Sequence, residues 1–415
     1  MAPVRPCRAR LAPGAQSCRA GGAARALPII GPRMPRRATK RGAQRTTLDR
    51  DCDVLICGAS FAGLAVAREL AATGADVLVV DRYEVGERQT SACGIPTTWL
   101  SALGLQEAGQ QTFGQLVLHT PHTTVRYDLP WTFSTFDYRT LCGLLADQGR
   151  FAFETAKVEG RSGQSVITDR GELRAPLIVD ALGWRRVLGA GENVQPPDAL
   201  LSRGLEVHPL GSGQDLEVWI DRRYVPAGYG WSFPAGGELR IGVGSFDPRF
   251  HVREPTVRLA AELVPHPPAD TGRYQGNWIP HALRPATEAG VFFVGDSAGH
   301  CLPLTAEGIR TALYFGLACG RELAGVLAGR QTREQALARY HQFSASHAAP
   351  FHWMLRVQRL VPRIAPRVLA PALGAMGAKR FVDWSFSQYL NIAHPDFATA
   401  GSPARAAARA ALAPA

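Results

Sequence analysis

The sequence has no apolar run long enough to cross a membrane and no cysteine pattern typical of a metal site. Hydrophobic residues make up 46% of the 415 residues, yet no stretch reaches the ~18 consecutive apolar residues that a spanning helix needs. None of the eight cysteines forms a Cys-x-x-Cys pair, and no Cys/His cluster has zinc spacing. We therefore expect a globular, cytoplasmic protein without a bound metal, whose cysteines are mostly buried and reduced.

The body of the chain also lacks any excess of charge, although the whole sequence carries +11. Residues 1–50 hold 12 Lys and Arg and one acid, whereas the other 365 residues hold 34 basic and 34 acidic side chains. A body without a basic bias has no electrostatic feature that would attract nucleic acid. We expect no nucleic-acid partner, and binding of nucleic acid or membrane through the basic leader remains a non-enzymatic alternative.

The leader, residues 1–50, is rich in Ala, Arg, Pro and Gly and has no apolar periodicity, so we expect it to be disordered. Its origin stays open between a non-native extension upstream of Met34, a solvated tail and a transit peptide. It lacks the apolar core of roughly 7–15 residues that a secretory signal requires. The tail, residues 401–415, has a similar composition and is also expected to be disordered.

The body begins with a predicted βαβ unit. Asp53–Cys57 and Asp76–Val80 are apolar runs typical of buried parallel strands, and Gly63–Thr73 has helical spacing between them. The turn GASFAG can bind a pyrophosphate at the helix N-terminus, and the acid that ends the second strand can bind ribose hydroxyls. The alternative is a tight βα turn without a ligand. The predicted cofactor contacts here are Gly58, Ser60, Ala62, Gly63, Asp81 and Arg82.

A second motif far along the chain indicates which dinucleotide is bound. Val291–Val294 is a predicted buried strand that delivers Asp296 into the Gly-rich loop GDSAGH. An acid there can bind a ribityl hydroxyl, and the next helix start can face the flavin, where negative charge develops on reduction. NAD-only enzymes do not need this element, which favours FAD, although the acid could simply cap the next helix. The predicted contacts are Gly295, Asp296, Gly299, Gly308 and Ile309.

The pair of motifs GASFAG and GDSAGH resembles the para-hydroxybenzoate hydroxylase-type FAD superfamily. Between them, Asp180–Gly183 (DALG) follows an apolar run, as the third motif of that superfamily does. Arg139 matches the arginine that these enzymes place near the flavin, with a charge on a helix surface as the alternative. The resemblance covers roughly residues 52–325 and implies an FAD-dependent oxidoreductase.

Two further segments narrow the resemblance to the geranylgeranyl reductases. Gly228–Pro234 (GYGWSFP) is similar to their Y-x-W-x-F-P motif, and Pro303–Ile309 (PLTAEGI) is similar to their P-x-T-G-E-G-I segment. The resemblance implies that Tyr229, Trp231 and Phe233 line a lipid pocket above the flavin. Alternate residues of a strand share one face, so these three rings could form an aromatic wall or a plain core stripe.

Two residues are candidates for catalysis. Cys93 stands in a segment, SACG, that resembles the flavin-adjacent Cys-Gly-Gly loop of the same family, although Ile95 replaces the second glycine. His300 follows the GD motif and could shuttle a proton, with a satisfied loop histidine as the alternative.

The implied reaction is reduction of C=C bonds in an isoprenoid or another apolar substrate by reduced flavin. NAD(P)H would dock only transiently, because the sequence has one dinucleotide fingerprint. The alternative is a monooxygenase that hydroxylates a small aromatic or apolar substrate; a halogenase fits less well, because GYGWSFP matches the W-x-W-x-I-P motif poorly. Apolar residues and arginines also interleave over 351–380, which favours either a peripheral membrane contact or a helix packed on the body.

We expect an α/β fold with a Rossmann-type FAD-binding domain, an interleaved antiparallel substrate domain and a helical C-terminus. The predicted FAD-binding domain is discontinuous over 52–115, 136–190 and 285–330, within a core of 52–330. The substrate domain takes 116–135 and 195–284, and the helical region takes 331–400. The sequence leaves the substrate, the electron donor and the oligomeric state open.

Overall fold

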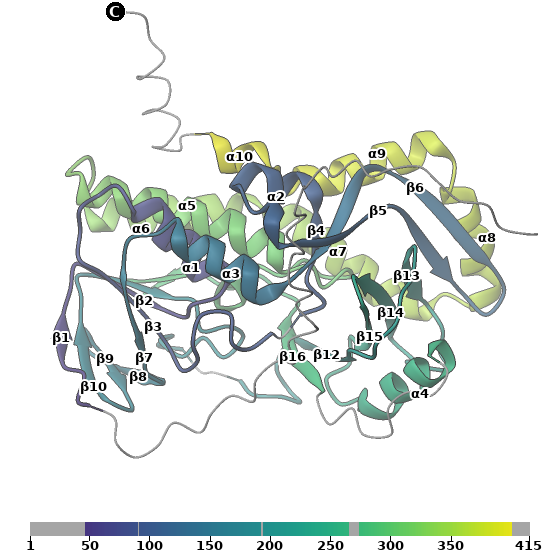
Figure 1. The fold of residues 1–415 in the computed structure, drawn as a ribbon, viewed down its shortest axis with the longest axis horizontal. Coiled ribbons are helices and arrows are strands. Elements are labelled where there is room, and N and C mark those ends of the chain that lie inside the picture. The colour runs from purple at the N-terminus through teal and green to yellow at the C-terminus, as the bar shows by residue number, and fades with distance from the viewer. Residues whose placement is uncertain (1–45, 90, 192–193, 265–273, 401–415) are drawn as a thin grey trace, which may run out of the picture. The chain divides into compact units, whose positions relative to one another are not determined.

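The computed structural model describes residues 46–89, 91–191, 194–264 and 274–400 (Figure 1). Most of the predicted leader and all of the predicted tail lie outside this part of the chain. Residues 46–50, which the prediction placed in the leader, contact the body instead. Leu48 is buried, and β1 (Arg50–Asp51) pairs with β10 (Gly171–Arg174). The described fold therefore begins ahead of the predicted boundary at residue 52.

A six-stranded sheet forms the Rossmann-type layer, with the order β17-β18-β11-β2-β3-β7. All neighbours run parallel except β17 and β18. The four central strands, β18, β11, β2 and β3, are short and almost wholly apolar, as buried parallel strands are. Their bounds are β2 (Val54–Cys57), β3 (Val77–Asp81), β7 (Ala152–Thr155), β11 (Leu177–Asp180), β17 (Thr287–Glu288) and β18 (Val291–Phe293).

Three helices lie together on one side of this sheet (Figure 1). They are α1 (Phe61–Leu70), α3 (Tyr138–Asp147) and α5 (Ile309–Leu327). Helices α1 and α5 pack closely through small residues: an added Cβ at Gly316 would lie 2.6 Å from the carbonyl oxygen of Ala62. A small sheet of order β1-β10-β9-β8 completes this half, with β8 (Val158–Ser162) and β9 (Ser165–Thr168).

The substrate-side sheet has eight strands in the order β16-β12-β15-β14-β13-β5-β6-β4. It is antiparallel except for β13 and β5. It includes residues 94–96 and 109–115, which the prediction assigned to the FAD-binding domain. One face packs on α4 (Arg253–Leu263) through Ile241, Val243 and Leu259. The strands are β4 (Gly94–Pro96), β5 (Gly109–His119), β6 (Thr124–Phe136), β12 (Leu201–Val207), β13 (Leu216–Trp219), β14 (Gly228–Ala235), β15 (Glu238–Ser245) and β16 (Gln275–Pro280).

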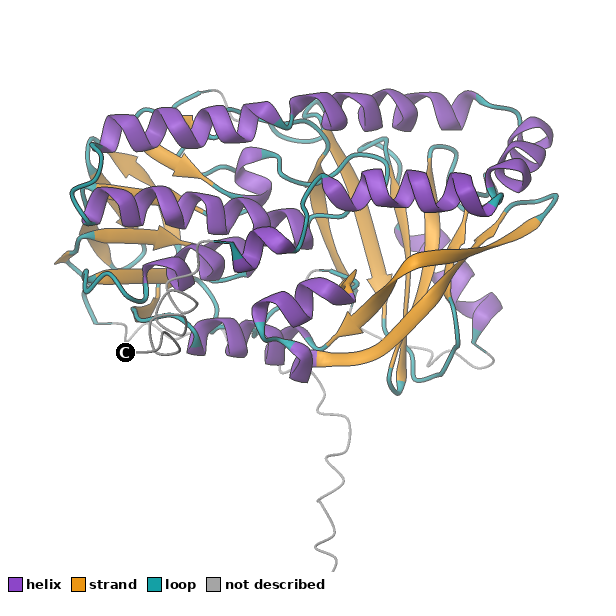
Figure 2. Cartoon of the chain, turned by 90° about the horizontal axis from the view of Figure 1, so that it is seen from above, coloured by secondary structure: helices purple, strands orange, loops and turns teal. Residues whose placement is uncertain are grey.

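The C-terminal region is helical, as the sequence predicts. Helices α8 and α9 lie beside the long β5–β6 ribbon (Figures 1 and 2), and the Tyr127 hydroxyl of β6 donates to the carbonyl oxygen of Leu373 at 2.8 Å. None of the described helices is both long and apolar enough to cross a bilayer. The remaining helices are α2 (Thr97–Leu103), α6 (Arg333–Ser346), α7 (Ala348–Leu360), α8 (Pro366–Met376), α9 (Lys379–Asn391) and α10 (Asp396–Thr399).

Candidate functional site

The turn between β2 and α1 has the close packing that its glycines predict. Gly58 has a φ of +115°, and an added Cβ there would lie 2.3 Å from the carbonyl oxygen of Ala181. At Gly63 an added Cβ would lie 1.9 Å from the Gly58 carbonyl oxygen. Ser60, between them, has an ordinary extended backbone, so no glycine is needed there. Its hydroxyl lies 3.1 Å from that of Tyr138.

The N-terminus of α1 is free to bind an anion. Ser60 makes no side-chain cap, and the first turn, which includes Ala62, holds no acid. Its N–H groups and the helix dipole are therefore available to a pyrophosphate. Asp81 ends β3 beside this turn and accepts hydrogen bonds from the N–H of Ala59 at 2.9 Å and of Tyr83 at 3.0 Å. Those contacts fix the carboxylate and leave it lone pairs for ribose hydroxyls. Arg82 is exposed and lies over the Tyr83 ring.

The DALG motif joins the two cofactor loops instead of facing a ligand. The buried carboxylate of Asp180 accepts from the N–H groups of Leu182 and Leu188 and from the hydroxyl of Ser297, at 2.7–2.9 Å. Ser297 belongs to the GD loop, so Asp180 fixes that loop to the end of β11. Arg186 adds a second link by donating to the Ser297 carbonyl at 2.8 Å. Sequence reasoning missed Arg186, because no motif marks it.

Asp296 has the features of a ligand-binding acid. Its carboxyl group has no hydrogen-bond partner within the described ranges, although it is only partly exposed. Burial raises its pKa from 3.8 to about 6, and Arg284 opposes that rise. The loop around it is tight, since an added Cβ at Gly299 would lie 2.0 Å from the Ala282 carbonyl oxygen. An unpaired acid in such a loop fits a hydroxyl-bearing cofactor such as FAD.

The start of α5 lies beside this acid, as predicted. An added Cβ at Gly308 would lie 3.6 Å from Oδ1 of Asp296, and Ile309 begins the helix. Gly295 packs on α1, because an added Cβ there would lie 3.0 Å from Cβ of Ala62. The two predicted cofactor loops are therefore neighbours in space. Arg139 is exposed at the start of α3 and packs against the backbone of Gly86.

The two predicted catalytic residues are both fully buried. The His300 ring stacks on Phe315, with centroids 3.8 Å apart, and its Nε2 lies 2.9 Å from the Ser344 hydroxyl. Burial lowers the pKa of His300 well below its usual value. The Cys93 thiol donates to the carbonyl oxygen of Ser91 at 3.2 Å, and burial raises the pKa of this thiol. The structure therefore places His300 in the core, and it places the Cys93 thiol in the interior, bonded to the backbone of its own loop.

The three predicted substrate rings share one face of the eight-stranded sheet. Tyr229, Trp231 and Phe233 alternate along β14 and are each half-buried. The Tyr229 hydroxyl donates to the carbonyl oxygen of Thr305 at 2.6 Å, which places this face against the PLTAEGI segment. That segment is tied to α9 in turn, because Glu307 accepts from Arg310 at 2.7 Å and from Tyr389.

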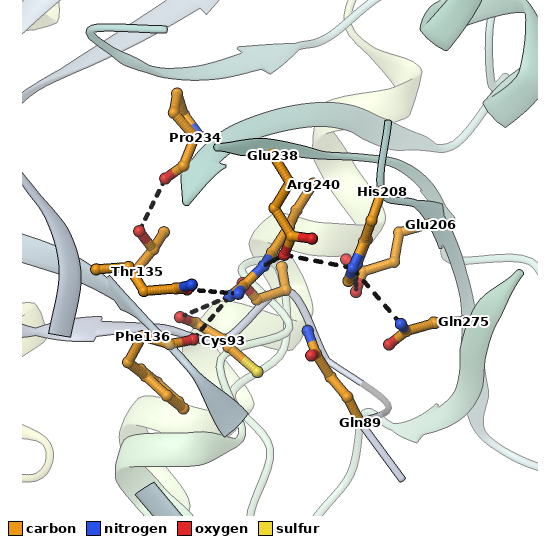
Figure 3. A network of polar contacts seen from close by, with 12 residues as sticks. Gln89, Cys93, Thr135, Phe136, Glu206, His208, Pro234, Glu238, Arg240 and Gln275 are labelled. Atoms are coloured by element: carbon orange, nitrogen blue, oxygen red, sulfur yellow. Dashed lines mark hydrogen bonds and ion pairs between the residues drawn. The ribbon is translucent and has the colours of Figure 1, made fainter. Parts of the chain in front are cut away.

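Arg240 is a further site residue that the sequence did not reveal (Figure 3). Its guanidinium is fully buried and donates to the carbonyl oxygens of Ala92 at 2.8 Å and Phe136 at 3.0 Å, and to Glu238 at 3.0 Å. It therefore holds the Cys93 loop against the same face of the sheet. Only the cross-strand register brings it there, since it lies opposite Phe233.

The sheet order, the glycine turn and the two acids define an FAD-dependent oxidoreductase. The family profile described as "FAD binding domain" matches residues 51–110. The digeranylgeranylglycerophospholipid reductase 3 of Methanosphaera stadtmanae is 23% identical over 72% of this chain and 83% of its own. The menaquinone reductase of Mycolicibacterium smegmatis is 27% identical over 66% of this chain and 76% of its own.

Solved structures share the fold. A geranylgeranyl bacteriochlorophyll reductase-like protein from Thermoplasma acidophilum superimposes with a TM-score of 0.69 at 15% identity, over 85% of this chain and 98% of that one. PqsL of Pseudomonas aeruginosa, described as a probable FAD-dependent monooxygenase, gives 0.56 at 19% identity, over 75% of this chain and 98% of that one. The resemblance to the geranylgeranyl reductase-like group of FAD-dependent oxidoreductases is thereby confirmed.

Proposed function

We propose that this enzyme reduces C=C bonds of an isoprenoid substrate with FAD as the bound cofactor. The observation that carries the proposal is the aromatic face of β14, where Tyr229, Trp231 and Phe233 form an apolar wall. Arg240 and Tyr229 hold this wall against the two loops that flank the predicted flavin site. An aromatic wall of this kind suits a prenyl chain. Two of the relatives compared above are named as reductases of an isoprenoid lipid or quinone.

FAD, when bound, supplies the hydride, and the chain supplies binding and orientation. The free N–H groups of α1 would hold the pyrophosphate, and Asp81 would hold a ribose. Asp296 would accept a hydrogen bond from a ribityl hydroxyl, and the N-terminus of α5, at Gly308 and Ile309, would face the reduced ring. Arg139 is proposed to lie near the flavin edge. We propose NAD(P)H as a transient electron donor, since the chain has one dinucleotide fingerprint.

Hydride transfer to a C=C bond also needs a proton, and the two candidate donors differ. Burial raises the pKa of the Cys93 thiol, so the thiol keeps its proton at neutral pH but is a weak acid. His300 has a lowered pKa and is neutral there, which makes it a poor acid. Of the two, Cys93 therefore suits proton donation better, although a water molecule could replace it. The variant Cys93→Ala tests this role. If Cys93 donates the proton, the variant should lose turnover and still bind flavin.

The experiment for the whole proposal uses the full chain loaded with FAD, under anaerobic conditions, with dithionite or NADPH as reductant. We expect geranylgeranyl substrates to gain two hydrogens per reduced bond, which mass spectrometry measures directly. Absence of any reduced prenyl product with both reductants would contradict the proposal. Rapid NADPH-dependent oxygen consumption coupled to a hydroxylated product would support the monooxygenase alternative instead.

We further propose that the C-terminal helices contact a membrane surface. Six of the ten exposed large hydrophobic side chains in the described part of the chain lie in this region. Residues 348–391 also contain six basic side chains and one acid, Asp383, which pairs with Lys379 at 2.9 Å. Exposed apolar groups among cations fit an anionic lipid surface. The hydrophobic set is Trp353, Leu360, Val368, Met376, Phe381 and Trp384.

Flotation with liposomes tests the membrane contact. We expect the protein to bind vesicles that contain phosphatidylglycerol and to bind vesicles of pure phosphatidylcholine weakly. High salt should weaken the binding to the phosphatidylglycerol vesicles. Joint replacement of Trp353 and Trp384 by Ala should release the protein. Replacement of the exposed Val257 on α4 by Ala is the matched control, because it removes apolar surface outside this region. Equal binding to both vesicle types would refute the proposal that the basic side chains attract an anionic lipid surface.

A further inference from the structure

A single row of side chains crosses four strands on the aromatic face of the eight-stranded sheet. Trp231 of β14 lies directly opposite Gly242 of β15, Gly242 opposite Glu206 of β12, and Glu206 opposite Gln275 of β16. Directly opposed residues point to the same side of a sheet. These four residues are called the Trp231 row below.

The Trp231 row concentrates buried polar atoms that have no partner. In the described ranges, eight buried side-chain N or O atoms lack a hydrogen-bond partner, and three of them belong to this row. They are Nε1 of Trp231, Oε2 of Glu206 and Oε1 of Gln275. Buried polar atoms are nearly always paired, by protein, water or ligand. Three in one row of one face therefore indicate a group that the protein alone does not supply.

The glycine in the row brings these atoms together. An added Cβ at Gly242 would lie 2.1 Å from Cζ2 of Trp231, so the indole lies flat over β15 and extends toward β12. Its edge also reaches Gly204, where an added Cβ would be 3.8 Å from the ring. The carbon edge of the indole, with Cζ2 over Gly242, therefore crosses β15 toward β12. The indole N–H lies on the same face of the sheet as Glu206.

The polar side of the row is fixed by a buried network (Figure 3). Oε1 of Glu206 lies 2.9 Å from Nε2 of His208, and Nδ1 of His208 lies 3.6 Å from the carboxylate of Glu238. The Gln275 amide nitrogen lies 3.5 Å from the same His208 nitrogen. Arg240 in turn holds Glu238. Glu206 is only 3% exposed, so its second oxygen, which has no partner among the described residues, lies away from bulk water.

The row lies between two contacts that join the sheet to the cofactor-side loops. On one side, Arg240 binds the carbonyl oxygen of Ala92 in the Cys93 loop. On the other side, Tyr229 binds the carbonyl oxygen of Thr305 in the PLTAEGI segment. Along β14, Trp231 lies between Tyr229 and Phe233, and Phe233 lies opposite Arg240. The row therefore lies between the Tyr229 contact and the Arg240 contact. Under the proposed function, the substrate's reacting part would lie beside the row.

We propose that the Trp231 row binds a hydroxyl group of the substrate. A hydroxyl donates one hydrogen bond and accepts others, so it can donate to Glu206 and accept from the Trp231 N–H at once. A phosphate or diphosphate only accepts and would be repelled by the carboxylate. A bare hydrocarbon would leave all three atoms unpaired. The row therefore selects a prenyl alcohol, or a similar neutral hydroxyl compound, over the corresponding diphosphate.

Binding of farnesol and farnesyl diphosphate to the oxidised, FAD-loaded full chain tests this inference by calorimetry. We expect farnesol to bind more tightly than farnesyl diphosphate. Glu206→Gln and Trp231→Phe should each weaken farnesol binding about tenfold or more, because the first replaces the charged acceptor of the hydroxyl with a neutral amide and the second removes the N–H donor. Their combined loss should be less than additive. Glu217→Gln, on the opposite face of the sheet, is the matched control and should bind as the wild type does.

Three results would overturn the inference. Unchanged farnesol affinity in both variants would mean that the row holds only water, and tighter binding of the diphosphate would contradict the selection. Failure of farnesol to bind the wild type would do the same. The inference rests on the proposed function for its choice of a prenyl probe, but the oxidised enzyme does not turn over. Farnesol binding that depends on the row, without reduction of any prenyl substrate, would therefore refute the proposed reduction alone.

Discussion

Replacement of Asp296 by Asn should stabilise the cofactor-free protein while weakening its hold on FAD. The carboxyl group lies in the GD loop and has no hydrogen-bond partner among the described residues. Burial raises its pKa from 3.8 to about 6 in the folded protein. The folded state thus favours the neutral form, and ionisation of this group at neutral pH opposes folding.

The sign and size of the effect follow from linkage. Between pH 3.8 and about 6 the native state binds more protons at Asp296 than the unfolded state does, so stability falls as the pH rises through this window. Above it the full penalty remains, and two pH units of difference in pKa correspond to about 3 kcal/mol. Asn cannot ionise and avoids the penalty. Partial exposure of Asp296 to solvent makes this figure an upper bound.

Urea unfolding of the apo-protein at pH 4 and pH 8 measures the prediction. The Asn variant should match the wild type at pH 4 and exceed it by up to about 3 kcal/mol at pH 8. FAD affinity should fall about tenfold, because a charged acceptor is lost. Asp198→Asn, at an exposed carboxylate, is the control and should change neither quantity. An Asn variant that is no more stable at pH 8 than the wild type would refute the assigned pKa.

Three other substitutions test the loops around the site. Gly58→Ala should cost about 1–3 kcal/mol in urea and abolish the flavin absorbance of the purified protein, because φ is +115° and the new Cβ meets the Ala181 carbonyl. Ala306→Gly should raise stability by about 1 kcal/mol, since Ala306 has a φ of +52°; no gain in Tm would argue against strain there. Arg240→Met should cost about 3–5 kcal/mol, because it removes a buried charge's ion pair with Glu238 and leaves the carbonyl oxygens of Ala92 and Phe136 without this donor, whereas Arg258→Met in an exposed pair with Glu254 should cost less than 1 kcal/mol.

The cofactor half could be predicted because its signals are local. Asp53, Gly58 and Asp81 lie within one βαβ unit, where spacing alone fixes a strand, a turn and a helix. The GD motif is far away in sequence, but it has its own strand and glycine loop. Each motif could therefore be recognised separately, and parallel pairing of β2, β11 and β18 then brings the loops together.

The polar part of the site could not be predicted, because it depends on register. Glu206 and Gln275 are 69 residues apart and meet only through β12–β16 pairing. Arg240 reads in the sequence as an ordinary surface charge, and its burial depends on carbonyl oxygens from the Cys93 loop and β6. For His300, the neighbouring motif suggests catalysis, and the stacking of its ring on Phe315 in the core is a contact that local reasoning does not reveal.

The strand β15 shows how one sheet serves both the core and the site. Ile241 and Val243 point to α4 and form the apolar core, while Gly242 and Gly244 alternate with them on the other face. Glycine weakens a strand, so the two glycines of this face are not there for their tendency to form strands. The cause is the Trp231 ring, which occupies the position that a Cβ at residue 242 would take. The local cost of glycine is thus the condition for laying the Trp231 ring across β15 on the face that carries Glu206, and Gly242→Ala should disturb the site before it disturbs the core.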